Sequence, residues 1–322
     1  MQNEKTMLDK KISFVIPCYY SEKSVEGVVN DIFKEFPADW YDIEIVLVND
    51  GSKDNTFGVI SSIAKQHDNV IAVNLAKNFG QDGARMAGYS FCSGDYVISL
   101  DDDGQNPPSE AHKLIAKLEE GYDAVFGKYQ VKKHSRFKNF GSKVNDKMAN
   151  IMIGKPKDLT LCSYFIMNRF VVNEILKYEG AFPYIWGLVL RCTDNIANEM
   201  IRHEAREIGE TTYTFAKLLG LWMNGFTSFS VKPLRVSMLL GVFFAFCGFL
   251  YLIYIISQQV IFGVPVEGWT SIMTVTLVLS GVQLIMLGMV GEYIGRTFMN
   301  ANKAPQFVVH DVVQSNKEND ED

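Results

Sequence analysis

The sequence has few cysteines, and their spacing matches neither a disulfide framework nor a metal-binding motif. The five are scattered through mostly apolar stretches: Cys18, Cys92, Cys162, Cys192 and Cys247. We therefore expect reduced cysteines of the kind found in the cytosol, and no zinc site.

Positive charge is also in the minority: the chain has 31 lysines and arginines but 37 acidic residues, so its net charge is −6. This balance argues against general nucleic-acid binding. The first eleven residues lack an apolar core, so we expect no cleavable signal peptide. With 322 residues, 48% of them hydrophobic, the chain is long enough for a large domain with an appendage, or for two domains.

Short apolar runs alternate with helical stripes over the first 130 residues. The expected strands cover 12–20, 43–50, 70–75, 96–100 and 123–129. The expected helices begin near Ser24, Thr56, Gly80 and Ala111. This alternation, with short connections, predicts a parallel, doubly wound sheet. A further strand that enters a helix is expected over 165–175.

A run of acidic residues directly follows the fourth expected strand. It consists of Asp101, Asp102 and Asp103, and Gln105 follows two residues later. Adjacent carboxylates repel one another unless a cation or a strong set of donors lies among them. Their hard oxygen atoms, at the ligand-binding edge of a sheet, suit Mg²⁺ or Mn²⁺. The alternative is a solvated acidic turn before a helix that prolines begin.

Two long uncharged runs, 236–256 and 270–290, lie near the end of the chain. Each is about 31 Å long as a helix, enough to cross the hydrocarbon of a bilayer, although a pair of buried core helices is the alternative. The loop between them has no lysine or arginine, whereas Lys232, Arg235 and Arg296 flank the pair. The positive-inside rule therefore predicts a multi-pass protein of the inner or plasma membrane, with the globular domain and both termini in the cytoplasm.

Two further stretches have a distinctive composition. Residues 131–150 are basic, which is typical of a solvated helix face or of an anion-binding segment. Residues 212–229 are rich in Phe, Leu, Trp and Met. They fit an amphipathic helix at a membrane interface, and a buried core helix is the alternative.

Taken in order, these motifs resemble those of the family 2 glycosyltransferases that load a sugar onto a polyprenyl phosphate, such as dolichol-phosphate mannose synthases and bactoprenol glucosyltransferases. FVIPCYYSE resembles the family's first strand and loop, and VNDGSKDNT its DDGSxDxT element. Residues 74–108 resemble the stretch from its RNFG segment into its DxDxQxPP metal site. GFTSFSVKPLR and GEYIGR resemble the entry to its first membrane span and the exit from its second. The likeness covers nearly the whole chain and implies an α/β, A-type glycosyltransferase fold with a Rossmann-like, mostly parallel sheet.

The resemblance implies roles for the residues that match these motifs. It implies a metal site, for Mg²⁺ or Mn²⁺, at Asp101, Asp103 and Gln105, and catalytic roles for Asp103 and Asp158. The implied nucleotide-binding residues are Pro17, Tyr19, Glu22, Asp50 and Asp102. The implied contacts to the acceptor phosphate are Arg136, Lys143 and Arg206.

The resemblance also predicts how the chain is divided. A cytosolic glycosyltransferase domain is expected over 1–211, and an interfacial amphipathic segment over 212–232. A two-helix transmembrane hairpin is expected over 233–292, and a cytosolic tail, acidic and disordered near its end, over 293–322.

The implied reaction moves a sugar, with inversion, from a nucleotide-sugar donor to a polyprenyl phosphate in the membrane. A UDP-sugar and undecaprenyl phosphate are the first expectations, with cell-envelope glycan modification as the purpose. The chain departs from the family pattern at Tyr20, Asn49, Ile166 and Thr212, so GDP-mannose and a modified pentose remain alternatives for the donor. A lipid phosphate is already ionised at neutral pH, so the reaction needs no dedicated base. A homo-oligomer is left open.

Two other functions fit parts of the sequence. A processive polysaccharide synthase shares the acidic motif, but the chain has no RW dipeptide and too few expected spans for a channel. A membrane-anchored scaffold that has lost activity is the other alternative. The intact DDDGQ run argues against it, because an inactive protein has no physical need for clustered acids.

Overall fold

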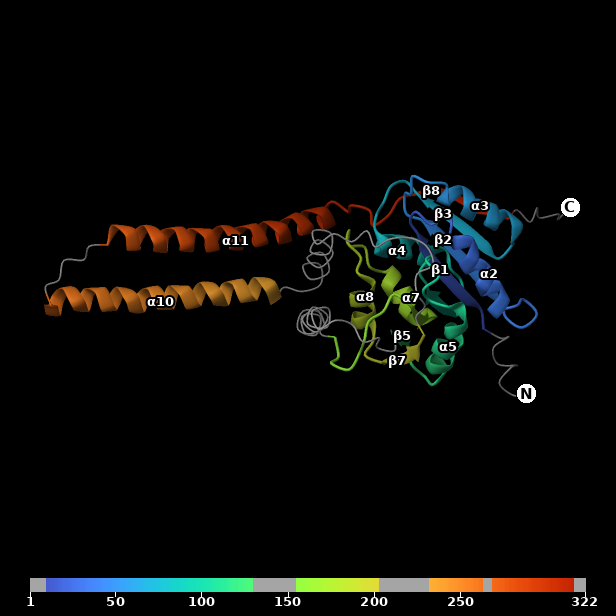
Figure 1. Ribbon diagram of the computed structural model, residues 1–322, viewed down its shortest axis with the longest axis horizontal. Coiled ribbons are helices and arrows are strands. Elements are labelled where there is room, and N and C mark those ends of the chain that lie inside the picture. Colours follow the sequence, from blue (N-terminus) through green and yellow to red (C-terminus); the bar gives the residue numbers. More distant parts are fainter. Residues whose placement is uncertain (1–9, 130–154, 203–231, 263–267, 316–322) are drawn as a thin grey trace.

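The computed structural model describes residues 10–129, 155–202, 232–262 and 268–315. In these residues an α/β domain carries a long helical hairpin that projects from one side (Figure 1). The domain is built on one eight-stranded sheet with the order β7-β5-β6-β4-β1-β2-β3-β8. Its strands are β1 (Ile12–Cys18), β2 (Ile43–Asn49), β3 (Val70–Leu75), β4 (Tyr96–Ser99), β5 (Ala124–Tyr129), β6 (Phe165–Asn168), β7 (Ile196–Ile201) and β8 (Val309–Gln314).

The central strands β4-β1-β2-β3 run parallel, as the alternation of strands and helices predicts. The expected fifth strand, β5, does not pair with β4, because β6 lies between them and is antiparallel to both. β8 is antiparallel to β3 at the other side of the sheet. The sheet is therefore mostly parallel and not wholly parallel, since the alternation rule carries no information on a later strand that enters between two earlier ones.

Helices cover both faces of the sheet. They are α2 (Val25–Glu35), α3 (Thr56–Gln66), α4 (Gln81–Phe91), η1 (Pro108–Glu110), α5 (Ala111–Glu119), α7 (Arg169–Leu176) and α8 (Ile185–Cys192), with α10 (Lys232–Phe262) and α11 (Trp269–Ala301) in the hairpin. Side chains of α2, α3 and α5 pack with Phe14 and Ile16 on one face. Those of α4, α7 and α8 pack with Val15 on the other face. This alternation along β1 creates two hydrophobic layers, which confirms the doubly wound arrangement.

The sequence does not predict β7 or β8. Both are edge strands in which polar residues interrupt the apolar pattern. Polar and charged residues are common in edge strands that are open to solvent. β8 lies in the stretch 293–322 that we expect as a tail, and α11 also extends into it as far as Ala301. These parts of the expected tail belong to the ordered fold, while residues 316–322 lie outside the described residues.

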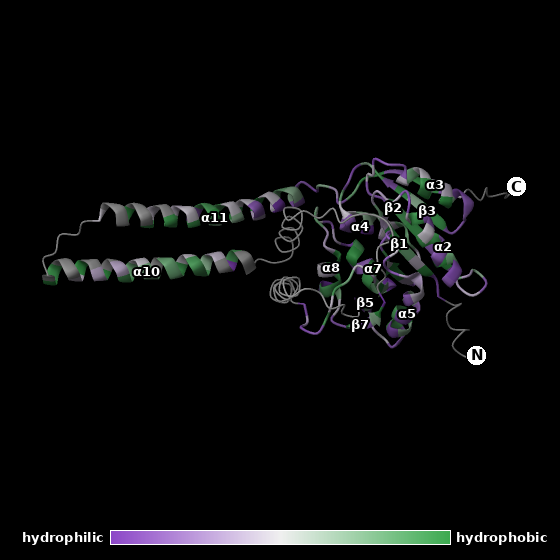
Figure 2. Ribbon diagram, in the orientation of Figure 1, coloured by the Kyte–Doolittle hydropathy of each residue, from purple (hydrophilic) through white to green (hydrophobic). Residues whose placement is uncertain are grey.

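The expected spans 236–256 and 270–290 fall within α10 and α11, respectively. Among the described residues, one stretch, Val278–Ala301, is long and apolar enough to cross a membrane. Ser237–Tyr251 in α10 is a shorter apolar stretch. Hydrophobic residues recur along both helices, as Figure 2 shows. The structure therefore offers one candidate span and a second helix whose apolar part is shorter.

The two helices of the hairpin lie side by side. The Ser237 hydroxyl lies 3.2 Å from the Met289 sulfur, and a Cβ added at Gly241 would lie 3.8 Å from the Met286 side chain, which is ordinary van der Waals contact. The expected interfacial segment precedes this hairpin, but its residues 212–231 lie outside the described part of the chain.

Gly88 of α4 lies against the sheet, and a Cβ added there would overlap Val15 and press on Val48 at 3.2 Å. We expect Gly88→Ala to destabilise the domain, because overpacking costs about 1–3 kcal/mol and outweighs a gain of about 1 kcal/mol in helix propensity. Gly27 of α2 has no atom within 4 Å of an added Cβ, so the control Gly27→Ala should be stabilising. Thermal unfolding midpoints of the two variants test this contrast, and a shift of the same sign in both would contradict it.

Candidate active site

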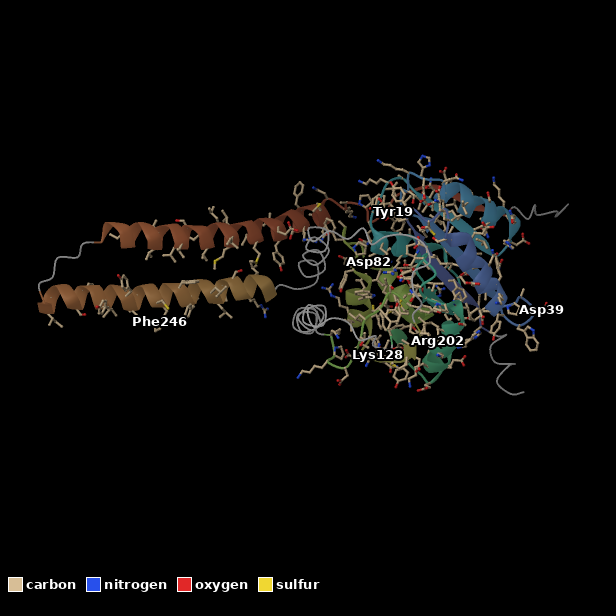
Figure 3. All side chains as sticks on the ribbon, in the orientation of Figure 1. Tyr19, Asp39, Asp82, Lys128, Arg202 and Phe246 are labelled. Carbon is tan, nitrogen blue, oxygen red and sulfur yellow. The ribbon has the colours of Figure 1, made fainter. Side chains whose placement is uncertain are left out.

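Three loops with predicted site residues meet at one edge of the sheet. They follow β1, β2 and β4, which are parallel neighbours, so their carboxyl ends lie together. In open α/β sheets this edge is where ligands bind. Figure 3 shows Tyr19, from the loop after β1, on the side of the domain nearer the hairpin, and Asp39 on the opposite side.

Asp50 follows β2 and is held by the loop that precedes α4. Its carboxylate accepts hydrogen bonds from the backbone N–H of Phe79 at 2.7 Å and from the side-chain amide of Asn78 at 3.0 Å. Burial raises the pKa of Asp50, and the backbone N–H groups of Phe79 and Gly80 oppose the rise. Asp50 is thus a buried carboxylate with a fixed direction at the edge of the sheet where open α/β proteins bind ligands.

Asp102 connects the acidic loop after β4 to the loop after β1. Its carboxylate accepts hydrogen bonds from the backbone N–H of Tyr19 at 3.2 Å and from the Ser21 hydroxyl. Burial raises the pKa of Asp102 to about 6, although these two hydrogen bonds favour the ionised form. The structure therefore joins Asp102 to the backbone of Tyr19, and the assignment of both residues to the nucleotide stays a prediction.

The other predicted nucleotide-binding residues lie in or beside the loop after β1. Pro17 is buried near the end of β1, opposite Val48 of β2. Glu22 accepts a hydrogen bond from the backbone N–H of Asn55 at 3.0 Å, so it joins the loop after β1 to the start of α3. Tyr19 is about half exposed and meets the Tyr20 ring edge to face, with 4.7 Å between the ring centroids. The exposed ring gives this loop an aromatic surface beside Asp50.

Both carboxylate oxygens of Asp101 are hydrogen-bonded. One oxygen accepts from the Gln81 amide at 2.8 Å and lies 3.3 Å from the Arg85 guanidinium. The other oxygen accepts from the Asn106 amide at 3.3 Å and from the Ser163 hydroxyl. These donors supply part of the compensation that three adjacent carboxylates require.

Asp103 and Gln105 complete the predicted metal-binding set. Gly104, with φ of +71°, turns the chain between them, and the backbone N–H of Gln105 donates to Asp103 at 3.1 Å. Among the described residues, no three His, Cys, Asp or Glu side chains form a cluster that could hold a metal ion. Mg²⁺ commonly takes one or two protein carboxylates and completes its shell with water and substrate phosphates. The oxygen donors of this loop fit such a shared site, and they do not fit a cation held by protein ligands alone.

Comparison with known protein families identifies the domain that carries this loop. The sequence model of glycosyl transferase family 2 matches residues 13–176, and the model named GtrB C-terminal hairpin matches residues 232–297. The chain belongs to glycosyl transferase family 2. The second match covers most of the α10–α11 hairpin, so the chain is of the polyprenyl-phosphate type within that family, as the sequence motifs predict.

Curated relatives match the chain over nearly its whole length. The chain is 33% identical to the undecaprenyl-phosphate 4-deoxy-4-formamido-L-arabinose transferase of Proteus mirabilis, over 97% of this chain and 98% of that protein. It is 31% identical to the protein of the same name from Photorhabdus laumondii subsp. laumondii, over 97% of both chains. The enzyme class of this family 2 protein is therefore that of a glycosyltransferase.

A solved structure shows the same fold. Glucosyl-3-phosphoglycerate synthase from Mycobacterium tuberculosis, in complex with Mn²⁺, UDP and phosphoglyceric acid, superposes with a TM-score of 0.50 at 19% identity. The match covers 67% of this chain and 76% of that one. At this identity the likeness establishes the fold, and it confirms the predicted A-type glycosyltransferase architecture of the family 2 domain.

A buried ion-pair cluster behind the acidic loop is absent from the sequence-based assignments. The Arg85 side chain is 2% exposed and lies 3.2 Å from Asp82 and 3.3 Å from Asp101. Gln81 and Arg85 occur four residues apart, so they lie on the same face of α4. An arginine in a helix rich in small residues is the one sequence signal of this contact, whereas nothing in the sequence indicates the hydrogen bond from Ser163.

The remaining predicted residues of this family 2 protein are not brought to the acidic loop by the described contacts. Asp158 is exposed in a turn that the backbone hydrogen bond from Leu159 to Pro156 closes at 3.2 Å. Its catalytic role stays a prediction. Arg136, Lys143 and Arg206, the expected contacts to an acceptor phosphate, lie outside the described residues.

Proposed function

We propose that the protein is an inverting, metal-dependent glycosyltransferase that moves a sugar from a UDP-sugar to undecaprenyl phosphate. The observation that carries this proposal is the acidic loop Asp101–Gln105 beside Asp50 and Tyr19, at the ligand-binding edge of a family 2 domain. The names of the curated relatives support the lipid acceptor and make a UDP-linked 4-deoxy-4-formamido-L-arabinose the first donor to test.

On the donor side, we assign Asp50 and Tyr19 to the nucleoside, with Pro17, Glu22 and Asp102 shaping the surrounding loops. Asp50 is buried and its direction is fixed by Asn78 and Phe79. Its carboxylate can therefore accept a hydrogen bond from a ribose or base without first reorienting. Tyr19 offers an exposed ring for stacking on a base.

On the diphosphate side, Asp101, Asp103 and Gln105 are the proposed holders of Mg²⁺ or Mn²⁺. When bound, the cation would stabilise the negative charge that grows on the departing nucleoside diphosphate. The lipid phosphate oxygen attacks the anomeric carbon as the bond from that carbon to the diphosphate oxygen breaks. UDP leaves with the electron pair, and the anomeric centre inverts. We propose Asp103 and Asp158 as the catalytic carboxylates of this site.

The acceptor side places the reaction at a membrane surface. We propose the division into a catalytic domain over 1–211, an interfacial segment over 212–232 and a transmembrane hairpin over 233–292, with both termini in the cytoplasm of a bacterial cell. The stretch 293–322 would then return from the hairpin to the cytosolic domain. The candidate span in α11 and the match of the hairpin model support this arrangement. Arg136, Lys143 and Arg206 are proposed to neutralise the lipid phosphate.

Purified protein in detergent should transfer a sugar from a UDP-sugar to undecaprenyl phosphate only when Mg²⁺ or Mn²⁺ is present. A screen of UDP-4-deoxy-4-formamido-L-arabinose, UDP-glucose and GDP-mannose, with lipid products identified by mass spectrometry, measures this. Reactions with EDTA, and reactions without lipid, are the controls. Release of free sugar with no lipid product from any donor would contradict the proposed acceptor, and full activity in EDTA would contradict the metal.

A further inference from the structure

The helix α11 is longer than a bilayer requires. Its 33 residues extend about 50 Å, whereas the hydrocarbon core of a bilayer is about 30 Å thick. An ion pair between Glu292 and Arg296, with 2.8 Å between the charged atoms, lies in its final turns. The apolar stretch Val278–Ala301 contains this pair, but charged side chains are costly in hydrocarbon, so we take the expected run 270–290 as the part of α11 that crosses the membrane. The last turns then continue beyond the membrane as the same unbroken helix.

This end of α11 contacts the loop between α7 and α8. The Arg296 guanidinium lies 4.9 Å from the centre of the Phe182 ring, and the Arg296 side chain is 8% exposed on a helix whose side chains are mostly exposed. The Asn300 side-chain oxygen accepts a hydrogen bond from the backbone N–H of Ala181 at 2.9 Å. Beyond the helix, the Gln306 amide donates to the backbone oxygen of Tyr178. We call the set Phe182, Ala181, Arg296 and Asn300 the α11 seat.

The α11 seat lies close to the part of the domain that supports the acidic loop. The loop that carries Phe182 runs directly into α8, where the backbone N–H of Ile185 faces the Asp82 carboxylate. Asp82 pairs with Arg85, and Arg85 pairs with Asp101. Figure 3 shows Asp82 on the side of the domain nearer the hairpin. A shift of the domain on α11 would therefore move the edge that carries the active site relative to the membrane.

We propose that Arg296 and Asn300 are positioning residues that fix the orientation and height of the catalytic domain above the bilayer, so that the acidic loop meets a membrane-embedded lipid phosphate. This inference rests on the proposed function. A continuous helix is stiff. Because α11 contacts Phe182 and Ala181, it holds the domain at a fixed position relative to the membrane. The described contacts of the seat lie in the loop between α7 and α8 and not at Asp50 or Tyr19, so we expect its loss to affect only a substrate whose position the membrane sets.

The test compares two acceptors for Arg296→Ala/Asn300→Ala: undecaprenyl phosphate in nanodiscs and a water-soluble short-chain prenyl phosphate. The apparent KM for the nanodisc lipid should rise roughly tenfold, which matches the loss of about 1.4 kcal/mol from a cation–π contact and a hydrogen bond. The KM for the donor and the turnover with the soluble acceptor should stay unchanged. Thr297→Ala, which removes an exposed hydroxyl bonded within α11, is the matched control. An equal loss with both acceptors, or no loss with either, overturns the proposal.

A second measurement separates this proposal from the proposed function. A fluorescent dye is attached to the cysteine of Asp39→Cys, in a Cys247→Ser background. Energy transfer between this dye and labelled lipid headgroups in the nanodisc measures the distance of the domain from the membrane. The distance should be narrowly distributed in the parent and in Thr297→Ala, and shifted or broadened in Arg296→Ala/Asn300→Ala. If the parent transfers sugar to neither acceptor, the proposed function fails, and the distance measurement still decides the seat. An identical distance distribution in all three proteins refutes the positioning role.

Discussion

Asp103→Asn is expected to lower turnover about 100-fold or more while the protein stays folded, because loss of electrostatic stabilisation of a transition state has effects of this size. Asparagine keeps the shape of the side chain and removes its negative charge. Asp103 is half-buried in the acidic loop and belongs to neither hydrophobic layer, so it contributes little to the packing of the core. The loss should therefore appear in the rate constant with the best donor, and the thermal unfolding midpoint should match that of the parent.

The control for this variant is Asp39→Asn. Asp39 is exposed on the opposite side of the domain, as Figure 3 shows, and its replacement changes the net charge by the same amount. The control should retain parental turnover. Titration of Mn²⁺ against both variants adds a second readout, since only Asp103→Asn should need a higher concentration of metal for its residual activity. Parental turnover of Asp103→Asn at low metal concentration would remove Asp103 from the site.

The central part of the fold is predictable from the sequence because its signals are local. β1, β2, β3 and β4 are short apolar runs between helical stripes, and such runs identify buried parallel strands. The position of β6 between β4 and β5, and the return of β8 to the edge beside β3, depend on contacts between distant parts of the chain. No periodicity within either segment encodes those pairings, so the alternation of strands and helices alone predicts only the parallel part of the sheet. The mostly parallel sheet that the family resemblance implies is the one the structure has.

The candidate site follows the same division. Asp50 and the acidic run 101–103 are candidates from the sequence because they follow expected strands whose carboxyl ends must meet, and the family resemblance adds Tyr19. Arg85 and Ser163 approach Asp101 from a helix and from a segment about sixty residues later in the chain, and packing alone brings them there. The sequence therefore reveals the carboxylates of the loop and leaves out the groups that hold one of them in place.

Arg85→Met is expected to destabilise the catalytic domain by about 3–5 kcal/mol, because removing one partner of a buried ion pair leaves the other charge uncompensated. Arg85 is fully buried between Asp82 and Asp101, and its guanidinium is 5.9 Å from the Phe165 ring. Methionine is apolar and has a similar volume, so a cavity accounts for a minor part of the expected loss. In a domain of this size the unfolding midpoint should fall by roughly 6–20 °C.

Two further variants test whether the loss is electrostatic. Lys34→Met removes an exposed cation from α2 and should shift the midpoint little, since surface charges contribute at most about 1 kcal/mol. Arg85→Met combined with Asp82→Asn removes one of the two stranded carboxylates, so the double variant should recover part of the stability that Arg85→Met loses. Thermal melts of the four proteins in detergent, followed by tryptophan fluorescence, give the comparison. A double variant that is less stable than Arg85→Met alone would show that Arg85 stabilises the domain through its packing and not through the charge of Asp82.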